Sequence, residues 1–243
     1  MTTPRPVSPP FDRIIFDCDS TLSRIEGIDE LAGEHKEEIA TLTRRAMSGE
    51  IPLQDVYGKR LEILTPTRNQ VATVGRLYIE QVTPGAKELL GALRSLGKEI
   101  VIVSGGLRLA VVAFAQWLGL RDENVHAVKV FFDGEGRYRG FDESSPLTRS
   151  EGKRSLLGDL PKGSRTAFVG DGMTDAEARD KVDTFIFFGG VAPRAEVESL
   201  ADASVTTENL ILLIPLLCSK EERDLLSRDP RHRDLLQHFE GTP

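Results

Sequence analysis

Two aspartates, Asp17 and Asp19, lie one residue apart at the end of an apolar run that reads "RIIFD". Carboxylates this close repel each other, and burying one of them alone carries a high desolvation cost. A buried strand that ends on such a pair needs a cation, a shared proton or a chemical task to neutralise it. A D-x-D pair is common by itself, so its meaning depends on the groups that lie beside it.

Further polar residues follow other apolar runs, where a parallel sheet would present them at one edge. They are Ser104 with Gly105 and Gly106, then Lys153, and then Asp171 with Asp175. Each has an ordinary explanation when taken alone: a glycine turn, a solvated lysine, or a carboxylate in the first turn of a helix. Open α/β sheets bind ligands at the carboxyl ends of their strands, so we expect these groups to meet.

Phosphoryl transfer is the chemistry that uses these residue types together. A hard cation such as Mg²⁺ takes oxygen ligands, and Asp17 and Asp171 offer carboxylates for it. The Ser104 hydroxyl, the glycine N–H groups beside it and the Lys153 ammonium would meet the remaining charge of a phosphate. A carboxylate can also attack phosphorus as a nucleophile. A second carboxyl two residues away can then protonate the leaving alkoxide and later deprotonate water.

The elements that must position these residues are typical of an α/β protein. Short apolar runs, rich in β-branched and aromatic residues, cover residues 13–17, 99–106, 166–172, 184–190 and, more weakly, 203–207. Amphipathic helical patterns separate most of them. Near-continuous apolar strands that alternate with helices predict an open, doubly wound, mainly parallel sheet with a Rossmann-like topology.

The stretch from residue 22 to 82 breaks this alternation because it reads as helices only. We therefore expect a helical cap domain, inserted into an α/β core that covers residues 13–21 and 83–218. Residues 128–142 place apolar runs around a glycine-rich turn, which predicts a β-hairpin.

The two ends of the chain differ in composition from the core. The proline-rich residues 1–12 predict a disordered leader, and residues 219–243 predict a charged C-terminal tail with a helical pattern. A net charge of -7 without a basic stripe argues against a nucleic-acid surface. No apolar run approaches the roughly 20 residues that span a bilayer. With two cysteines and no secretory leader, we expect free thiols and a cytoplasmic monomer or homodimer that acts on a small molecule.

Four motifs of this chain, "DCDST", "VSGG", Lys153 and "GDGMTD", resemble those of the haloacid dehalogenase-like hydrolases. Within that superfamily, "DSTLSRIEGIDELA", "TRRAMSGEIPL", "FDE" and "GDGMTDAEA" resemble the phosphoserine phosphatases, over about residues 13–217. The resemblance implies that Asp17 is the nucleophile and Asp19 the general acid/base. It also implies Mg²⁺, held by the Asp17 carboxylate, the Asp19 backbone carbonyl and Asp171, with Asp175 in support.

The same resemblance implies hydrolysis of O-phospho-L-serine to L-serine and phosphate through an aspartyl-phosphate, as in L-serine biosynthesis. Glu26 would hold the substrate ammonium, and Arg60 would pair with its carboxylate. The other substrate-binding positions that it implies are Met47, Ser48, Ser104, Gly105, Gly106, Lys153 and Thr174. Two positions depart from the family pattern: Ser48 stands where glycine is usual, and Arg154 follows Lys153 where the family often has glycine.

Other functions fit parts of the same pattern. A related phosphatase could act on phosphothreonine, phosphohomoserine or a sugar phosphate, and a phosphotransferase would pass the phosphoryl group to an alcohol. A non-catalytic, phosphate-binding regulator belongs to a different class, but such a module would be expected to have lost Asp19 or Asp171, and both are present. Glu26 and Arg60 together favour an amino-acid phosphate as the substrate.

Overall fold

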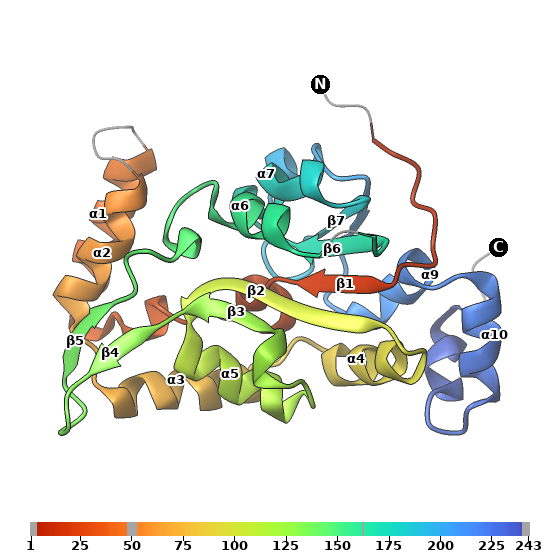
Figure 1. The fold of residues 1–243 in the computed structure, drawn as a ribbon, viewed down its shortest axis with the longest axis horizontal. Helices are drawn as coiled ribbons and strands as arrows, with labels where there is room; N and C mark the ends of the chain where they lie inside the picture. Colours follow the sequence, from red (N-terminus) through yellow and green to blue (C-terminus); the bar gives the residue numbers. More distant parts are fainter. Residues whose placement is uncertain (1–3, 48–52, 162, 240–243) are drawn as a thin grey trace.

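The protein, seen in a computed structural model that describes residues 4–47, 53–161 and 163–239, is built around one parallel sheet. Six strands lie in the order β3-β2-β1-β6-β7-β8 (Figure 1). They are β1 (Arg13–Phe16), β2 (Glu99–Leu107), β3 (Val125–Val128), β6 (Thr166–Gly170), β7 (Thr184–Phe188) and β8 (Ala203–Val205). Every neighbouring pair among them is parallel. This confirms the predicted doubly wound, mainly parallel α/β fold.

The strand order reverses at the centre of the sheet, between β1 and β6. After β1 the chain adds β2 and β3 on one side, and later β6, β7 and β8 on the other. Neighbouring strands of an open α/β sheet leave a crevice at their carboxyl ends where the order reverses, and ligands bind there. The ends of β1 and β6 are the points at which the sequence places Asp17 and Asp171.

Both faces of the sheet are covered, which explains why its central strands are apolar throughout. Side chains alternate along β1, so Ile14 and Phe16 join one core while Ile15 joins the other. Figure 1 shows α4 (Ala86–Ser95) and α5 (Arg108–Trp117) on one face, and α6 (Gly152–Asp159) and α7 (Met173–Glu177) on the other. The short helices α8 (Ala195–Glu198) and α9 (Ile214–Leu217) complete the layers.

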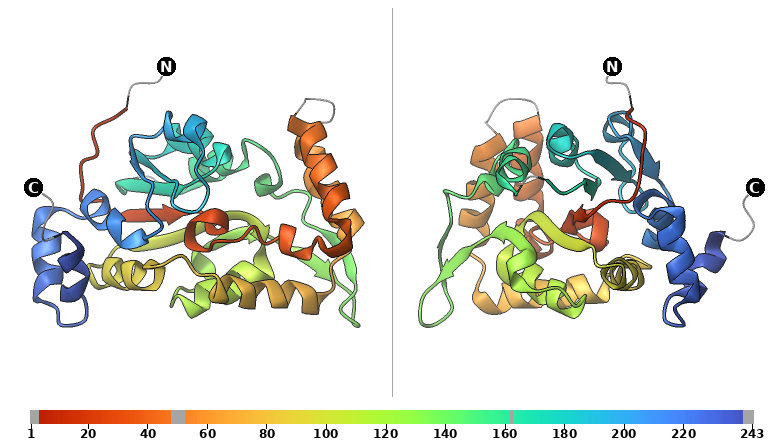
Figure 2. Two further views of the ribbon diagram at one scale, coloured as in Figure 1. Left: turned by 180° about the vertical axis from the view of Figure 1, so that it is seen from behind. Right: turned by 45° about the vertical axis from the view of Figure 1, so that its right-hand side comes forward.

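The inserted segment contains α1 (Lys36–Met47), α2 (Leu53–Leu64) and α3 (Arg68–Glu80). Thr67 caps α3, in a capping box with Gln70. Figures 1 and 2 show α1 and α2 together at one end of the molecule, whereas α3 lies along α5. A side chain at Gly75 of α3 would lie only 3.2 Å from a backbone oxygen of α5, so these two helices are in close contact. The segment therefore has an outlying part and a part packed on the core.

The predicted hairpin is confirmed, and it reaches the inserted helices. Strands β4 (Val130–Phe132) and β5 (Tyr138–Phe141) pair antiparallel. The ring of Phe141 lies 5.4 Å from that of Tyr57 on α2. Just before the hairpin, β3 is a strand that the sequence analysis does not predict. It is a four-residue edge strand whose two middle residues are half-buried, so it lacks a continuous apolar run.

Residues 4–12 differ from the predicted disordered leader, because Arg5 and Phe11 attach this otherwise largely exposed segment to the core. Arg5 donates hydrogen bonds to Asp202 and to the carbonyl of Val182, and Phe11 is only 1% exposed. Proline content predicted disorder here, but it does not take account of the Arg5 guanidinium and the Phe11 ring, which attach the segment. At the other end, the tail contains α10 (Lys220–Arg228) and a 3₁₀ helix over Arg233–Phe239. No helix in the described part of the chain is long and apolar enough to cross a membrane.

Both ends are attached through buried charges. The Lys98 ammonium donates to the carbonyl of Phe11 at 2.8 Å and lies 2.6 Å from Glu222 on α10. The Asp202 carboxylate, which is fully buried, accepts hydrogen bonds from Arg5, from Arg179 and from the Phe185 N–H. Burial alone would raise the pKa of Asp202, but the hydrogen bonds from Arg5 and Phe185 outweigh it and hold this pKa below its ordinary value.

We expect Asp202→Asn to lower the free energy of unfolding by about 3 kcal/mol at neutral pH, because it leaves two guanidinium groups without their carboxylate. A lowered pKa in the folded state stabilises the fold above the unfolded-state value of about 3.9, and this contribution is lost as the pH falls through the folded-state pKa. The difference between variant and wild type should therefore shrink in acid, as measured by urea unfolding from pH 7 down to pH 3. The exposed Asp224→Asn is the control, and a difference that stayed constant with pH would contradict this account.

Candidate active site

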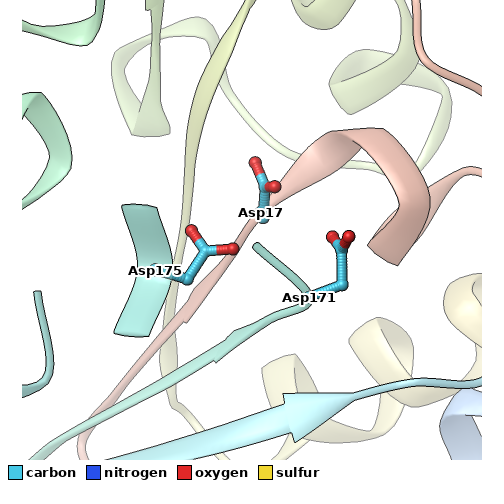
Figure 3. Close-up of side chains that lie close together, drawn as sticks. All are labelled: Asp17, Asp171 and Asp175. Carbon is cyan, nitrogen blue, oxygen red and sulfur yellow. The ribbon is translucent and has the colours of Figure 1, made fainter. Parts of the chain in front are cut away.

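Three acidic side chains converge at the carboxyl ends of β1 and β6, as Figure 3 shows. Asp17 follows β1 directly, and Asp171 and Asp175 follow β6. Each offers a carboxylate oxygen within 4.8 Å of the others, and the three residues are 7%, 1% and 0% exposed. The backbone fixes this corner, because the Asp17 N–H donates to the Val169 carbonyl at 2.9 Å. The topology thus brings together carboxylates that lie more than a hundred residues apart in the chain.

Lys153, in the first turn of α6, lies between two of these acids. Its ammonium is 2.8 Å from Asp17 Oδ1 and 2.6 Å from Asp175 Oδ1. Burial alone would lower the pKa of Lys153, but the charges of Asp17 and Asp175 outweigh it and raise this pKa above its ordinary value. Lys153 is therefore charged at neutral pH and stands where the sequence predicts a phosphate-binding cation.

One lysine does not neutralise the cluster. Burial raises the pKa of Asp17 well above its ordinary value, and Lys153 offsets only part of the effect because Asp175, Asp171 and Asp19 act against it. Burial, followed by the charge of Asp175, also raises the pKa of Asp171, to about 7. The raised pKa values mean that the site disfavours negative charge on Asp17 and Asp171, and an additional cation would relieve this cost.

Asp175 supports the other groups rather than facing the cavity. Its Oδ1 accepts a hydrogen bond from Lys153, and its Oδ2 accepts one from the Gly172 N–H at 2.9 Å. A side chain at Gly170 would lie 2.4 Å from Asp175 Oδ2, so glycine is required there. Both carboxylate oxygens of Asp175 are therefore engaged within the protein, and its role in supporting a metal ion remains a prediction.

Arg194 is a site residue that the sequence analysis missed. Its guanidinium contacts the Asp171 carboxylate and lies 3.7 Å from Glu26 Oε1. It belongs to the loop after β7, the strand next to β6 in the sheet. Its place after a predicted strand is the one sequence feature that could have identified it as a site residue. Thr21 donates to the other oxygen of Asp171 at 2.9 Å, so both oxygens of this carboxylate have a donor.

A cavity of about 370 Å³ opens above these groups. The predicted site residues that line it are Asp17, Asp19, Glu26, Arg60, Gly105, Gly106, Lys153, Asp171 and Thr174. The wall also contains residues that were not predicted, among them Tyr57, Thr148, Arg149, Ser150, Met173 and Arg194. The cavity has a polar floor at the sheet edge and a side formed by α2 of the inserted segment.

The remaining predicted residues lie behind the cavity or outside the described part. Ser104 is fully buried, accepts from the Gly106 N–H at 2.9 Å and donates to Asp19 Oδ2 at 3.2 Å. Ser48 lies outside the described residues. Met47 ends α1, and its side chain is likewise outside the described part. Predictions for Met47 and Ser48 therefore remain predictions.

Two charged residues come from the loop after β1 and from α2. Glu26 accepts a hydrogen bond from the Ser20 hydroxyl at 2.7 Å, and burial, followed by the charge of Asp19, raises its pKa. Arg60 lines the cavity from α2 and pairs with Asp29. Glu26 and Arg60 both line the cavity, as the sequence predicts. In the structure each already has a protein partner, Ser20 for Glu26 and Asp29 for Arg60.

The donor set fits a hard divalent cation. Asp17 and Asp171 are buried carboxylates with raised pKa values, and oxygen-rich sites of net negative charge are those that Mg²⁺ takes. Arg194 on Asp171 shows that this carboxylate already attracts a cation. A bound divalent ion would neutralise charge that develops on a phosphate in the transition state.

The chain matches the family described as haloacid dehalogenase-like hydrolase over residues 11–182. The parallel sheet, the aspartates after β1 and the cluster after β6 agree with that match. The protein belongs to the haloacid dehalogenase-like hydrolases.

Similar proteins of known activity indicate which kind of hydrolase this is. The chain is 38% identical over 200 residues to the phosphoserine phosphatase of Rattus norvegicus, a match covering 80% of this chain and 89% of that protein. It is 37% identical over 203 residues to the phosphoserine phosphatase of Homo sapiens, with the same coverage. A solved structure of a substrate-bound phosphoserine phosphatase complex matches with a TM-score of 0.71 and 26% identity, covering 86% of this chain and 100% of that one. The protein is a phosphatase.

We expect Mg²⁺ to raise the melting temperature of the wild-type protein, because it neutralises the carboxylates of the cluster. At 100 times its dissociation constant, a ligand that binds only the folded state adds about 2.7 kcal/mol to the free energy of unfolding. Asp171→Asn should lose most of this gain in a calorimetric titration with MgCl₂. The control, Asp180→Asn, removes an exposed carboxylate outside the cluster and should keep the full gain; an equal gain in both variants would contradict the site.

Proposed function

We propose that this phosphatase hydrolyses O-phospho-L-serine to L-serine and phosphate, with Mg²⁺ as its cofactor. The observation that carries the proposal is that one cavity is lined by Asp17 and Lys153 and also by Glu26 and Arg60. Phosphoserine has a phosphate, an ammonium and a carboxylate, and these three groups correspond to those three parts of the cavity. The names of the relatives in rat and human support the same substrate.

Asp17 is the nucleophile in this proposal. One of its carboxylate oxygens attacks phosphorus, an acyl phosphate bond forms, and the bond from phosphorus to the serine oxygen breaks. Asp19 gives its proton to that oxygen, so L-serine leaves as the neutral alcohol. Lys153 and Gly105 line the cavity beside Asp17, and the Lys153 ammonium and the Gly105 N–H would hold the phosphate oxygens for in-line attack, while the Gly106 N–H is bonded to Ser104.

Water then completes the reaction. The Asp19 carboxylate takes a proton from water as it attacks phosphorus, and the bond to Asp17 breaks to release phosphate. Asp17 and Asp171 would hold the cation, together with the Asp19 backbone carbonyl, and Asp175 would keep Lys153 in place. The cycle returns Asp17 as a carboxylate and Asp19 as an acid.

Recognition of the amino acid would come from Glu26 and Arg60. Glu26 is acidic, lines the cavity and has a side chain that is 48% exposed, so it can pair with the substrate ammonium. Arg60 can offer its planar fork to the carboxylate, exchanging Asp29 for the substrate. We also propose that α1 and α2 form the closing part of the cap, since α3 is packed on the core. A cytoplasmic location and a role in serine biosynthesis are part of the same proposal.

The first test is phosphate release with Mg²⁺ from a panel of L- and D-phosphoserine, phosphothreonine, phosphohomoserine and two sugar phosphates. We expect a clear preference for L-phosphoserine and no release by Asp17→Asn, which removes the nucleophile. Comparable rates across the panel would be consistent with the phosphatase mechanism but would reject L-phosphoserine as the specific substrate. Release by Asp17→Asn equal to that of the wild type would reject the mechanism.

The second test concerns the carboxylate of the substrate. We expect Arg60→Ala to lower kcat/KM for phosphoserine roughly 10- to 100-fold, because a hydrogen-bonded charge contact contributes about 1.5–3 kcal/mol. Phosphoethanolamine has no carboxylate, so its turnover should be nearly unchanged in the same variant. Arg76→Ala, which removes an exposed guanidinium from α3, is the control. Equal losses on both substrates would remove Arg60 from carboxylate recognition.

A further inference from the structure

Three hydrogen-bond donors hold the Asp19 carboxylate in place. Its Oδ1 accepts a hydrogen bond from the Gly27 N–H at 2.6 Å and another from the Tyr78 hydroxyl at 2.7 Å. Its Oδ2 has one longer contact, with the Ser104 hydroxyl at 3.2 Å. The two oxygens therefore differ: Oδ1 is fixed by two short hydrogen bonds, and Oδ2 is the freer oxygen.

Tyr78 reaches Asp19 from a distant part of the chain, through space that a glycine leaves open. A side chain at Gly27 would lie 2.0 Å from the Tyr78 hydroxyl, so the two positions are matched to each other. The tyrosine is 0% exposed, and its ring stacks on Phe114 of α5 with 5.6 Å between the ring centres. A buried hydroxyl aimed at a carboxylate is a specific arrangement, because an unpaired one would be costly there.

The position of Tyr78 on α3 distinguishes it from a cap contact. Helix α3 packs on α5, where Gly75 permits the close approach described above. Tyr57, on α2, instead donates to the Gly105 carbonyl at 2.9 Å and so joins the outlying part of the inserted segment to the core. The Tyr78 contact therefore belongs to the part of the inserted segment that packs on the core, apart from α1 and α2.

We propose that Tyr78 is a positioning residue for Asp19. Its hydroxyl and the Gly27 N–H fix Oδ1, which turns the carboxyl group so that Oδ2 is left for proton exchange with the leaving oxygen and then with water. Tyr78 touches neither the substrate nor the reacting atoms, and it acts only through Asp19. This inference rests on the proposed function, in which Asp19 is the general acid and base.

Tyr78→Phe tests the inference, because it keeps the ring stacked on Phe114 and removes only the hydroxyl. With L-phosphoserine and Mg²⁺ we expect kcat to fall roughly 10-fold, as for loss of a hydrogen bond to a charged group, with KM unchanged. The melting temperature should change little. In crystal structures, the Asp19 carboxyl group should turn away from the Gly27 N–H or adopt two orientations. Tyr138→Phe removes a hydroxyl on the hairpin, outside the cavity, and serves as the control.

The outcomes separate the inference from the proposed function. An unchanged kcat in Tyr78→Phe would overturn the inference, since Asp19 would then work without this hydroxyl. A fall in kcat accompanied by a higher KM and a lower melting temperature would also overturn it, because the residue would then act through packing. If the wild type releases phosphate from no substrate, the proposed function fails. The orientation of Asp19 in the two crystal structures would then decide the positioning role without any activity.

Discussion

The structure depends on one electrostatic constraint, the burial of three carboxylates around a single lysine. Asp17, Asp171 and Asp175 share the crevice between β1 and β6, and Lys153 contacts two of them. Burying charge costs much free energy, and strongly perturbed carboxylates in a cleft are typical of functional sites. In the proposed function, these carboxylates hold a cation, and the cation together with Lys153 binds the phosphate.

The scaffold holds these charges by conventional packing. Two apolar cores cover the two faces of the sheet, and they fix the ends of β1 and β6 against each other. The inserted segment divides into α3, which is part of this scaffold, and α1 with α2, which stand apart at one end (Figure 1). Asp17, Lys153 and Asp171 thus come from the core, whereas Arg60 comes from the outlying part.

Most of the fold and the floor of the site could be predicted from local sequence signals. The apolar runs gave five strands, and the polar corners after them gave Asp17, Ser104 and Asp171. The sequence predictions were wrong or incomplete where the structure depends on contacts between distant residues or where the local sequence pattern is weak. Strand β3 is short and half-buried, and Arg194 carries no motif of its own. Arg5 is attached by Asp202, a residue almost two hundred positions away, which proline content cannot reveal.

The sequence by itself determined the residue types and their order: two aspartates after the first strand, a lysine, and an acidic glycine loop after a later strand. These follow from covalent spacing and from the period of apolar residues. Only the tertiary structure decided which partners each group has. Tyr78 lies fifty-nine positions from Asp19, yet their oxygens are 2.7 Å apart because α3 packs on α5. Contacts of this kind depend on how helices and strands pack in three dimensions, and no local pattern encodes them.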